Sequence, residues 1–129
     1  MTSTIDALLV DCSDPGEVGR FWARALEWRI VEEAGGEIEI TDPQGRDRPI
    51  LFQVVPEPKS VKNRLHLDLR PATSMHAEVE RLVAAGAAVQ ERIDEHGSFW
   101  TVMRDPEGNE FCVLRGPEDG WSPEGGGTG

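Results

Sequence analysis

The sequence has few cysteines, and it lacks both long apolar runs and an excess of positive charge. Cys12 and Cys112 are too few for a disulfide scaffold, so we expect two reduced thiols in a cytoplasmic protein. No window reaches the 18 or so apolar residues of a membrane span. The N-terminal residues also lack the basic start and apolar run of a signal peptide. With 24 acidic against 13 basic residues, nucleic acid and anionic membranes are not expected as partners.

One order of predicted elements, a strand, a helix and three strands, occurs twice along the chain. Asp14 fits a helix N-cap, Pro15 fits the first helical position, and Glu17 completes the spacing of a capping box. Asp-Pro-x-Gly turns begin at Asp42 and Asp105, about 60 residues apart, which indicates an internal duplication. The predicted strands are 4–12, 28–33, 37–41, 49–55, 64–70, 87–93, 98–104 and 109–115, and the predicted helices run over 15–26 and from Thr73 or Ser74 to Ala85.

This order predicts an α+β fold made of two βαβββ modules, at 4–55 and 64–115. Both modules belong to one domain that spans residues 1–115. Each module would form a four-stranded mixed sheet with one helix on its back, and the two sheets would pair to form a cup. Residues 116–129 are rich in Gly and Pro and lack periodicity, so we expect a disordered tail.

The segment Asn63–Arg70 alternates leucines with polar residues, as a strand with one buried face does. Its polar face carries His66, Asp68 and Arg70, spaced about 7 Å apart at strand geometry. Two interpretations are open for this row. It could consist of a histidine hydrogen-bonded within the fold and a surface ion pair of little energetic value, or it could line the cup. The duplicated architecture favours the cup.

Three further side chains are candidates for the same space. Glu110 and Cys112 share one face of the last predicted strand, since they alternate with apolar residues. Glu110 is a pocket-lining carboxylate or a solvated one, and Cys112 is a small buried hydrophobe. Trp100 alternates with its neighbours in the same way, but alternation does not tell which face of its strand is the cup.

Four motifs carry a resemblance to a known family: the helix region 14–28, and the segments 52–57, 62–69 and 105–114. In these the chain resembles the vicinal-oxygen-chelate superfamily of glyoxalase I, extradiol dioxygenases, and fosfomycin- and bleomycin-resistance proteins. It is most similar to the small glyoxalase-like domains. The resemblance implies the paired-module fold, a small-molecule ligand in the cup, and assembly into homodimers.

The resemblance also implies a divalent metal, such as Zn, Ni, Mn or Fe, held by one residue from the first and one from the last strand of each module. The corresponding positions here are Ala7, Gln53, His66 and Cys112. Ala7 offers no ligand atom, so the implied ligands are His66 and Gln53, with Glu110 or Cys112 as a further one.

Two functions from different classes follow from this pattern. The first is a lyase- or isomerase-type enzyme in which His66 and Glu110 are catalytic. Gln53, Asp68, Arg70, Trp100 and Cys112 would then contact the substrate. The second is a binding protein of the bleomycin-resistance type, whose net charge of −11 would attract a cationic ligand. A regulatory dimer with a vestigial pocket is a third alternative.

Overall fold

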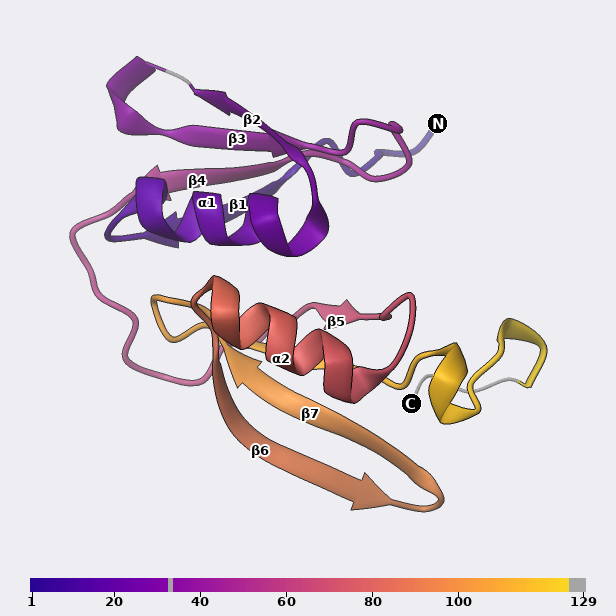
Figure 1. The fold of residues 1–129 in the computed structure, drawn as a ribbon. Helices are drawn as coiled ribbons and strands as arrows, with labels where there is room; N and C mark the ends of the chain where they lie inside the picture. Colours follow the sequence, from indigo (N-terminus) through magenta and orange to yellow (C-terminus); the bar gives the residue numbers. More distant parts are fainter. Residues whose placement is uncertain (33, 126–129) are drawn as a thin grey trace. The chain divides into compact units, whose positions relative to one another are not determined.

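The computed structural model describes residues 1–32 and 34–125, and the chain forms two compact units, Met1–Ser60 and Val61–Gly129 (Figure 1). Each unit has the order β-α-β-β-β and contains one four-stranded mixed sheet with one helix. The predicted fold class and the duplicated order of elements are therefore confirmed. Within residues 1–32 and 34–125, no helix combines the length and the apolar character needed to cross a membrane.

The first unit is organised by a parallel pair of strands at one side of its sheet. Strand β1 pairs with β4 in parallel, and the remaining pairs are antiparallel, which gives the order β1-β4-β3-β2. The elements are β1 (Leu8–Cys12), α1 (Pro15–Leu26), β2 (Arg29–Glu32), a 3-10 turn η1 (Ala34–Gly36), β3 (Ile38–Thr41) and β4 (Ile50–Val54).

Helix α1 begins and ends where the sequence predicts. The Asp14 carboxylate accepts a hydrogen bond from the Glu17 N–H at 3.1 Å, and Pro15 occupies the first turn. The helix ends at Glu27, whose φ of 57° is left-handed. Its apolar stripe packs on β3 and β4, and the buried residues of the helix include Val18, Phe21, Trp22 and Ala25.

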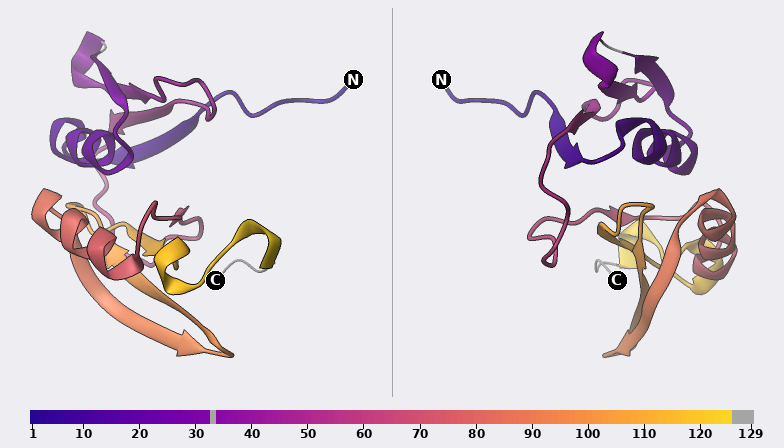
Figure 2. Two further views of the ribbon diagram at one scale, coloured as in Figure 1. Left: turned by 45° about the vertical axis from the view of Figure 1, so that its right-hand side comes forward. Right: turned by 90° about the vertical axis from the view of Figure 1, so that its left-hand side faces the viewer.

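The second unit repeats this plan, with the sheet order β5-β8-β7-β6. Strand β5 pairs with β8 in parallel, and the other pairs are antiparallel. The β6–β7 hairpin turns at His96 and Gly97, both with positive φ, and it extends beyond the end of the helix (Figure 2). The elements are β5 (Asp68–Leu69), α2 (Met75–Ala85), β6 (Ala88–Glu95), β7 (Ser98–Arg104) and β8 (Glu110–Val113).

Helix α2 covers only one face of this sheet. Met75 and Leu82 of the helix are buried, together with Met103, Phe111 and Val113 of β7 and β8. Alternation along each strand therefore sends the intervening side chains to the opposite face, which no helix among the described residues of this unit covers. That open face holds most of the candidate residues.

The strand predicted at 64–70 is mostly wrong, because β5 contains only Asp68 and Leu69. The amide of Cys112 donates to the Leu67 carbonyl and that of Leu114 to the Leu69 carbonyl, both at 2.9 Å, and the parallel ladder begins there. Leu65 is 86% exposed. Alternating polarity reports on side-chain direction along a segment, whereas a strand also needs a partner for its backbone.

The sequence predicts a disordered tail over residues 116–129, of which 126–129 lie outside the described residues, and residues 116–121 make tertiary contacts. The Asp119 carboxylate accepts hydrogen bonds from the amides of Met75, at 2.7 Å, and Gly116, at 2.9 Å. Trp121 stacks under the Arg70 guanidinium at 3.9 Å. We call residues 116–121 the C-terminal clasp. In Figure 1 it lies beside the N-terminal end of α2. The segment lacks periodicity because it contains only a short 3-10 helix, η2 (Pro117–Asp119), and is held in place by tertiary contacts.

We expect Asp119→Ala to destabilise the chain, since it removes the acceptor for the Met75 amide at the start of α2. The loss in unfolding free energy should be about 1 kcal/mol, as for other helix caps, and urea unfolding followed by circular dichroism would measure it. Glu118→Ala removes the same charge from a neighbouring exposed side chain and serves as the control. Equal stability of the two variants would contradict a capping role for Asp119.

Candidate functional site

The open face of the second unit forms a groove of about 450 Å³. Side chains from β5, β6, β7 and β8 line it, together with the segment that precedes β5. The lining residues are Lys62, His66, Asp68, Gln90, Glu91, Ile93, Trp100, Val102, Glu110, Cys112 and Leu114. The groove therefore collects most of the residues proposed from sequence, within one unit.

Strand register divides the groove into a polar end and an apolar end. Asp68 pairs with Cys112, Cys112 with Val102, and Val102 with Glu91, so these four form one row across the sheet. On one side of this row, Ile93 pairs with Trp100. Leu114 follows Cys112 on the same face and completes the apolar end. On the other side lie His66, Glu110, Lys62 and Gln90.

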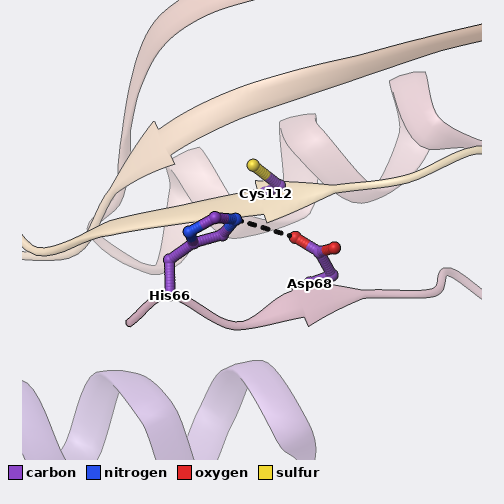
Figure 3. Close-up of side chains that lie close together, drawn as sticks. All are labelled: His66, Asp68 and Cys112. Carbon is purple, nitrogen blue, oxygen red and sulfur yellow. Dashed lines mark ion pairs between the residues drawn. The ribbon is translucent and has the colours of Figure 1, made fainter. Parts of the chain in front are cut away.

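His66 and Asp68 form the polar pair at the centre of the groove (Figure 3). The His66 Nε2 atom lies 3.4 Å from the Asp68 carboxylate, and their side chains are 41% and 48% exposed. An ion pair of this exposure contributes little to stability. The pair matters for orientation. The Asp68 carboxylate fixes which edge of the His66 imidazole faces Asp68, and the ring remains accessible from the groove.

Cys112 lies directly beside this pair. Its side chain is buried, and its sulfur lies within 4.8 Å of an Asp68 carboxylate oxygen. Burial and the negative charge of Asp68 raise the pKa of the Cys112 thiol to about 11, against a smaller opposing effect of Lys62. The thiol is therefore a neutral hydrogen-bond donor near pH 7. It is not a reactive thiolate there.

Glu110 is positioned by the segment that leads into β5. Its carboxylate accepts a hydrogen bond from the Asn63 amide at 3.0 Å, and the Asn63 side chain donates to Asn109 at 3.3 Å. These contacts hold the segment around Asn63 beside the start of β8, so that Lys62 lines the groove. The sequence did not predict Lys62 as a groove residue. It lies in a proline-rich connection, where no periodicity indicates which way the side chains point.

Gln90, Glu91 and Ile93 of β6 were also missed. The register of β6 against β7 shifts between Val89 and Glu91, which is a β-bulge. A bulge breaks the period of two, so the alternation read from the sequence does not assign these side chains to a face. Trp100, whose face was left open by the sequence, lines the groove together with Val102.

Two predicted site residues are not among the lining residues of this groove. Gln53 belongs to β4 of the first unit, where its amide donates to Asp11 at 2.7 Å. Arg70 donates to the Arg115 carbonyl at 2.8 Å and stacks on Trp121, so it holds the C-terminal clasp and does not line the groove.

Three groove residues of different chemistry could hold a metal ion. One ligand atom each from His66, Asp68 and Cys112 lies within 4.8 Å of the other two. They offer a nitrogen, an oxygen and a sulfur donor. This set fits zinc and related ions better than it fits magnesium or calcium, which prefer oxygen ligands.

The family model of the glyoxalase-like domain matches residues 7–114. Among solved structures, the fosfomycin resistance protein FosX from Listeria monocytogenes, complexed with Mn(II) and 1S,2S-dihydroxypropylphosphonic acid, is similar with a TM-score of 0.71 and 12% identity, covering 90% of this chain and 92% of that one. A glyoxalase-related enzyme from Fulvimarina pelagi has a TM-score of 0.68 and 18% identity, covering 90% of each chain. A comparison with curated proteins finds no match.

A glyoxalase/bleomycin resistance protein/dioxygenase family enzyme from Burkholderia phytofirmans is also similar, with a TM-score of 0.68 and 16% identity, covering 84% of this chain and 94% of that one. At these identities the solved structures show the fold.

We expect Cys112 in a Cys12→Ser background to react with iodoacetamide only as the pH rises toward about 11, because the neutral thiol is unreactive. Mass spectrometry across this pH range would measure the rate. Asp68→Asn should move the profile to lower pH, since it removes the neighbouring negative charge, whereas Asp94→Asn outside the groove should not. A reaction profile centred near pH 9, the ordinary thiol pKa, both with Asp68 present and with Asp68→Asn, would contradict the raised pKa of Cys112.

Proposed function

Because the chain belongs to the family of glyoxalase-like domains, we propose that it binds a small organic molecule in the groove of its second unit and acts on it by acid–base chemistry. The observation that carries this proposal is the division of the groove into an apolar end around Trp100 and a polar end around His66. Ligand sites typically combine a mostly apolar lining with a few convergent polar groups.

Each groove residue has a role in this proposal. Trp100 and Ile93 would bind an apolar or planar part of the molecule. His66 would take up and return a proton, as lyases and isomerases require, while Asp68 keeps the imidazole oriented. Glu110 would accept a hydrogen bond from the substrate or act as a second acid–base group.

The charge of the groove favours a cationic ligand. Asp68, Glu91 and Glu110 contribute three carboxylates to the lining, and Lys62 is the one lysine or arginine among the lining residues. A phosphonate of the kind bound by FosX from Listeria monocytogenes would face these carboxylates in the metal-free groove. An amine would be attracted by them, and by the net charge of −11 at longer range.

The same charge supports a second candidate, a binding protein that sequesters a cationic aromatic compound without breaking a bond. Binding then needs the Trp100 end and the carboxylates, but no proton transfer at His66. The two functions therefore predict different results when His66 is replaced: an enzyme would lose turnover, whereas a binding protein would still bind its ligand.

We also propose a cytoplasmic homodimer. Two buried cysteines, Cys12 and Cys112, too few for a disulfide scaffold, suit a reducing compartment. Leu9 and Val54 of the first unit are each 57% exposed, and apolar side chains of this exposure suit an interface. The mass of the chain in solution, measured by light scattering, would test the oligomeric state.

We expect benzyltrimethylammonium to bind the groove more tightly than benzoate, because both present a phenyl ring and the lining carboxylates attract the cation and repel the anion. Shifts of the β6, β7 and β8 amide signals in NMR titrations would report binding. Glu91→Gln should weaken the cation by roughly two- to fivefold, the effect of one partly exposed charge. Glu95→Gln on the same strand, outside the groove, is the control. Equal affinity for benzoate would argue against an acidic site.

If the chain is an enzyme, His66→Gln should lower turnover by about 10²- to 10⁴-fold, the usual contribution of a general acid or base. Proton NMR would follow the conversion of a library of epoxides and aldehyde–thiol adducts by the wild-type chain, and the active compound would be used with the variant. His76→Gln, on the exposed surface of α2 beside Glu80, is the matched control. A compound that binds tightly, returns unchanged and tolerates His66→Gln would establish the binding function instead.

A further inference from the structure

An arginine stands at the border of the groove, where the chain leaves β5. The Leu114 amide donates to the Leu69 carbonyl at 2.9 Å, and this bond of the parallel ladder places Arg70 opposite Leu114. Leu114 lines the apolar end of the groove, whereas Arg70 is not among the lining residues. A positive charge is therefore held next to an acidic groove without entering it.

Contacts with the C-terminal part of the chain hold this guanidinium. The Arg70 Nη1 atom donates to the Arg115 carbonyl at 2.8 Å. The Arg70 Cζ atom lies 3.9 Å from the centroid of the Trp121 ring, which is a close cation–π contact. Both contacts direct the side chain toward the C-terminal clasp and away from the other side chains that continue its alternation, His66 and Asp68.

The charges around Arg70 do not favour this position. Burial and the positive charge of Arg115 lower the pKa of the Arg70 guanidinium, whereas the negative charge of Asp68 raises it. The charged side chain would thus be more stable farther from Arg115 and closer to Asp68. The local electrostatics draw the guanidinium toward the groove, and its stacking on Trp121 opposes this attraction.

A released guanidinium could reach the groove. Asp68 precedes Arg70 by two positions, about 7 Å at strand spacing, which an extended arginine side chain can span. An arginine and a carboxylate form strong, often bidentate hydrogen bonds. With Arg70 inside, the three carboxylates of the lining would face two cations, Arg70 and Lys62, and the groove would lose much of its attraction for a cation.

We propose that Trp121 sets the charge specificity of the groove by holding the Arg70 guanidinium outside it. Trp121 is not among the lining residues, so it acts through Arg70 as a positioning residue. This inference rests on the proposed function, because it concerns the preference of the same groove for cations. The contrasting arrangement is a clasp that stabilises the second unit and has no effect on specificity.

The ratio of the dissociation constants of benzoate and benzyltrimethylammonium tests the proposal, with both constants taken from NMR titrations of the full-length chain. Trp121→Ala should lower this ratio by roughly three- to tenfold, because the released charge weakens the binding of the cation and strengthens that of the anion. Trp121→Phe should keep the wild-type ratio, since a phenyl ring also stacks on a guanidinium.

A double variant separates the release of Arg70 from a general loosening of the clasp. Trp121→Ala combined with Arg70→Gln should recover the wild-type ratio, because no positive charge is left to enter the groove. Arg70→Gln alone should change the ratio less than Trp121→Ala does, and in the opposite direction. Circular dichroism would establish that each variant is folded.

Phe99→Ala is the matched control. The Arg92 Cζ atom lies 4.7 Å from the centroid of the Phe99 ring, so this variant also releases a stacked guanidinium in the second unit. Arg92 alternates with Glu91 and Ile93, which line the groove, and it is not among the lining residues. The released charge stays on the other face of the sheet, and the ratio should remain that of the wild-type chain.

The charge beside Asp68 can also be measured without a bound probe. In a Cys12→Ser background, Cys112 would be alkylated with anionic iodoacetate and with cationic 2-bromoethyltrimethylammonium. The ratio of the two rates at one pH does not depend on the fraction of thiolate, because that fraction is common to both reactions. Trp121→Ala should raise the rate with iodoacetate relative to the rate with the cation, and adding Arg70→Gln should reverse this change.

Failure of this inference can be told apart from failure of the proposed function. If the wild-type chain prefers the cation and Trp121→Ala leaves both ratios unchanged, Trp121 has no such role and the proposed function stands. A change that persists in the double variant would likewise overturn the role of Arg70. If the wild-type chain binds neither probe, the proposed function is contradicted, and the alkylation rates alone decide whether Trp121 holds Arg70 away from the groove.

Discussion

The parallel pairing of β5 with β8 is the constraint on which the second unit depends. Only two residues of β5 are in the ladder, yet their backbone hydrogen bonds place Asp68 opposite Cys112. His66 precedes Asp68 by two positions on the same face, and Glu110 precedes Cys112 in the same way. A shift of β5 by one residue against β8 would turn Asp68 and His66 away from the groove.

Much of the fold could be predicted from sequence, because its helices have strong local signals. Asp14, Pro15 and Gly86 mark helix ends with their own side chains or backbone freedom, and α1 spans the predicted residues. The start of β5 could not be predicted in this way. Leu65 has the polarity of a buried strand residue, but no strand partner lies beside it, and pairing partners are not encoded locally.

The site was predictable where alternation is regular. Glu110, Cys112 and Trp100 lie on uninterrupted strands, and all three line the groove. Glu91 was missed because a bulge in β6 shifts the register beside it. Arg70 was assigned to the site because it continues the alternation of His66 and Asp68. In the structure its guanidinium stacks on Trp121 of the C-terminal clasp, 51 positions further along the chain.

The C-terminal clasp also sets an order of events during synthesis. Met75 receives its cap from Asp119, which lies 44 residues later in the chain. Strand β5 likewise gains its partner in the sheet, β8, with residues 110–113. The first unit has all its strands once residue 54 has left the ribosome. Helix α2 has its local Ser74 cap early, but it gains the contact of Asp119 with the Met75 amide, and β5 gains β8, only when residues 110–119 have been translated.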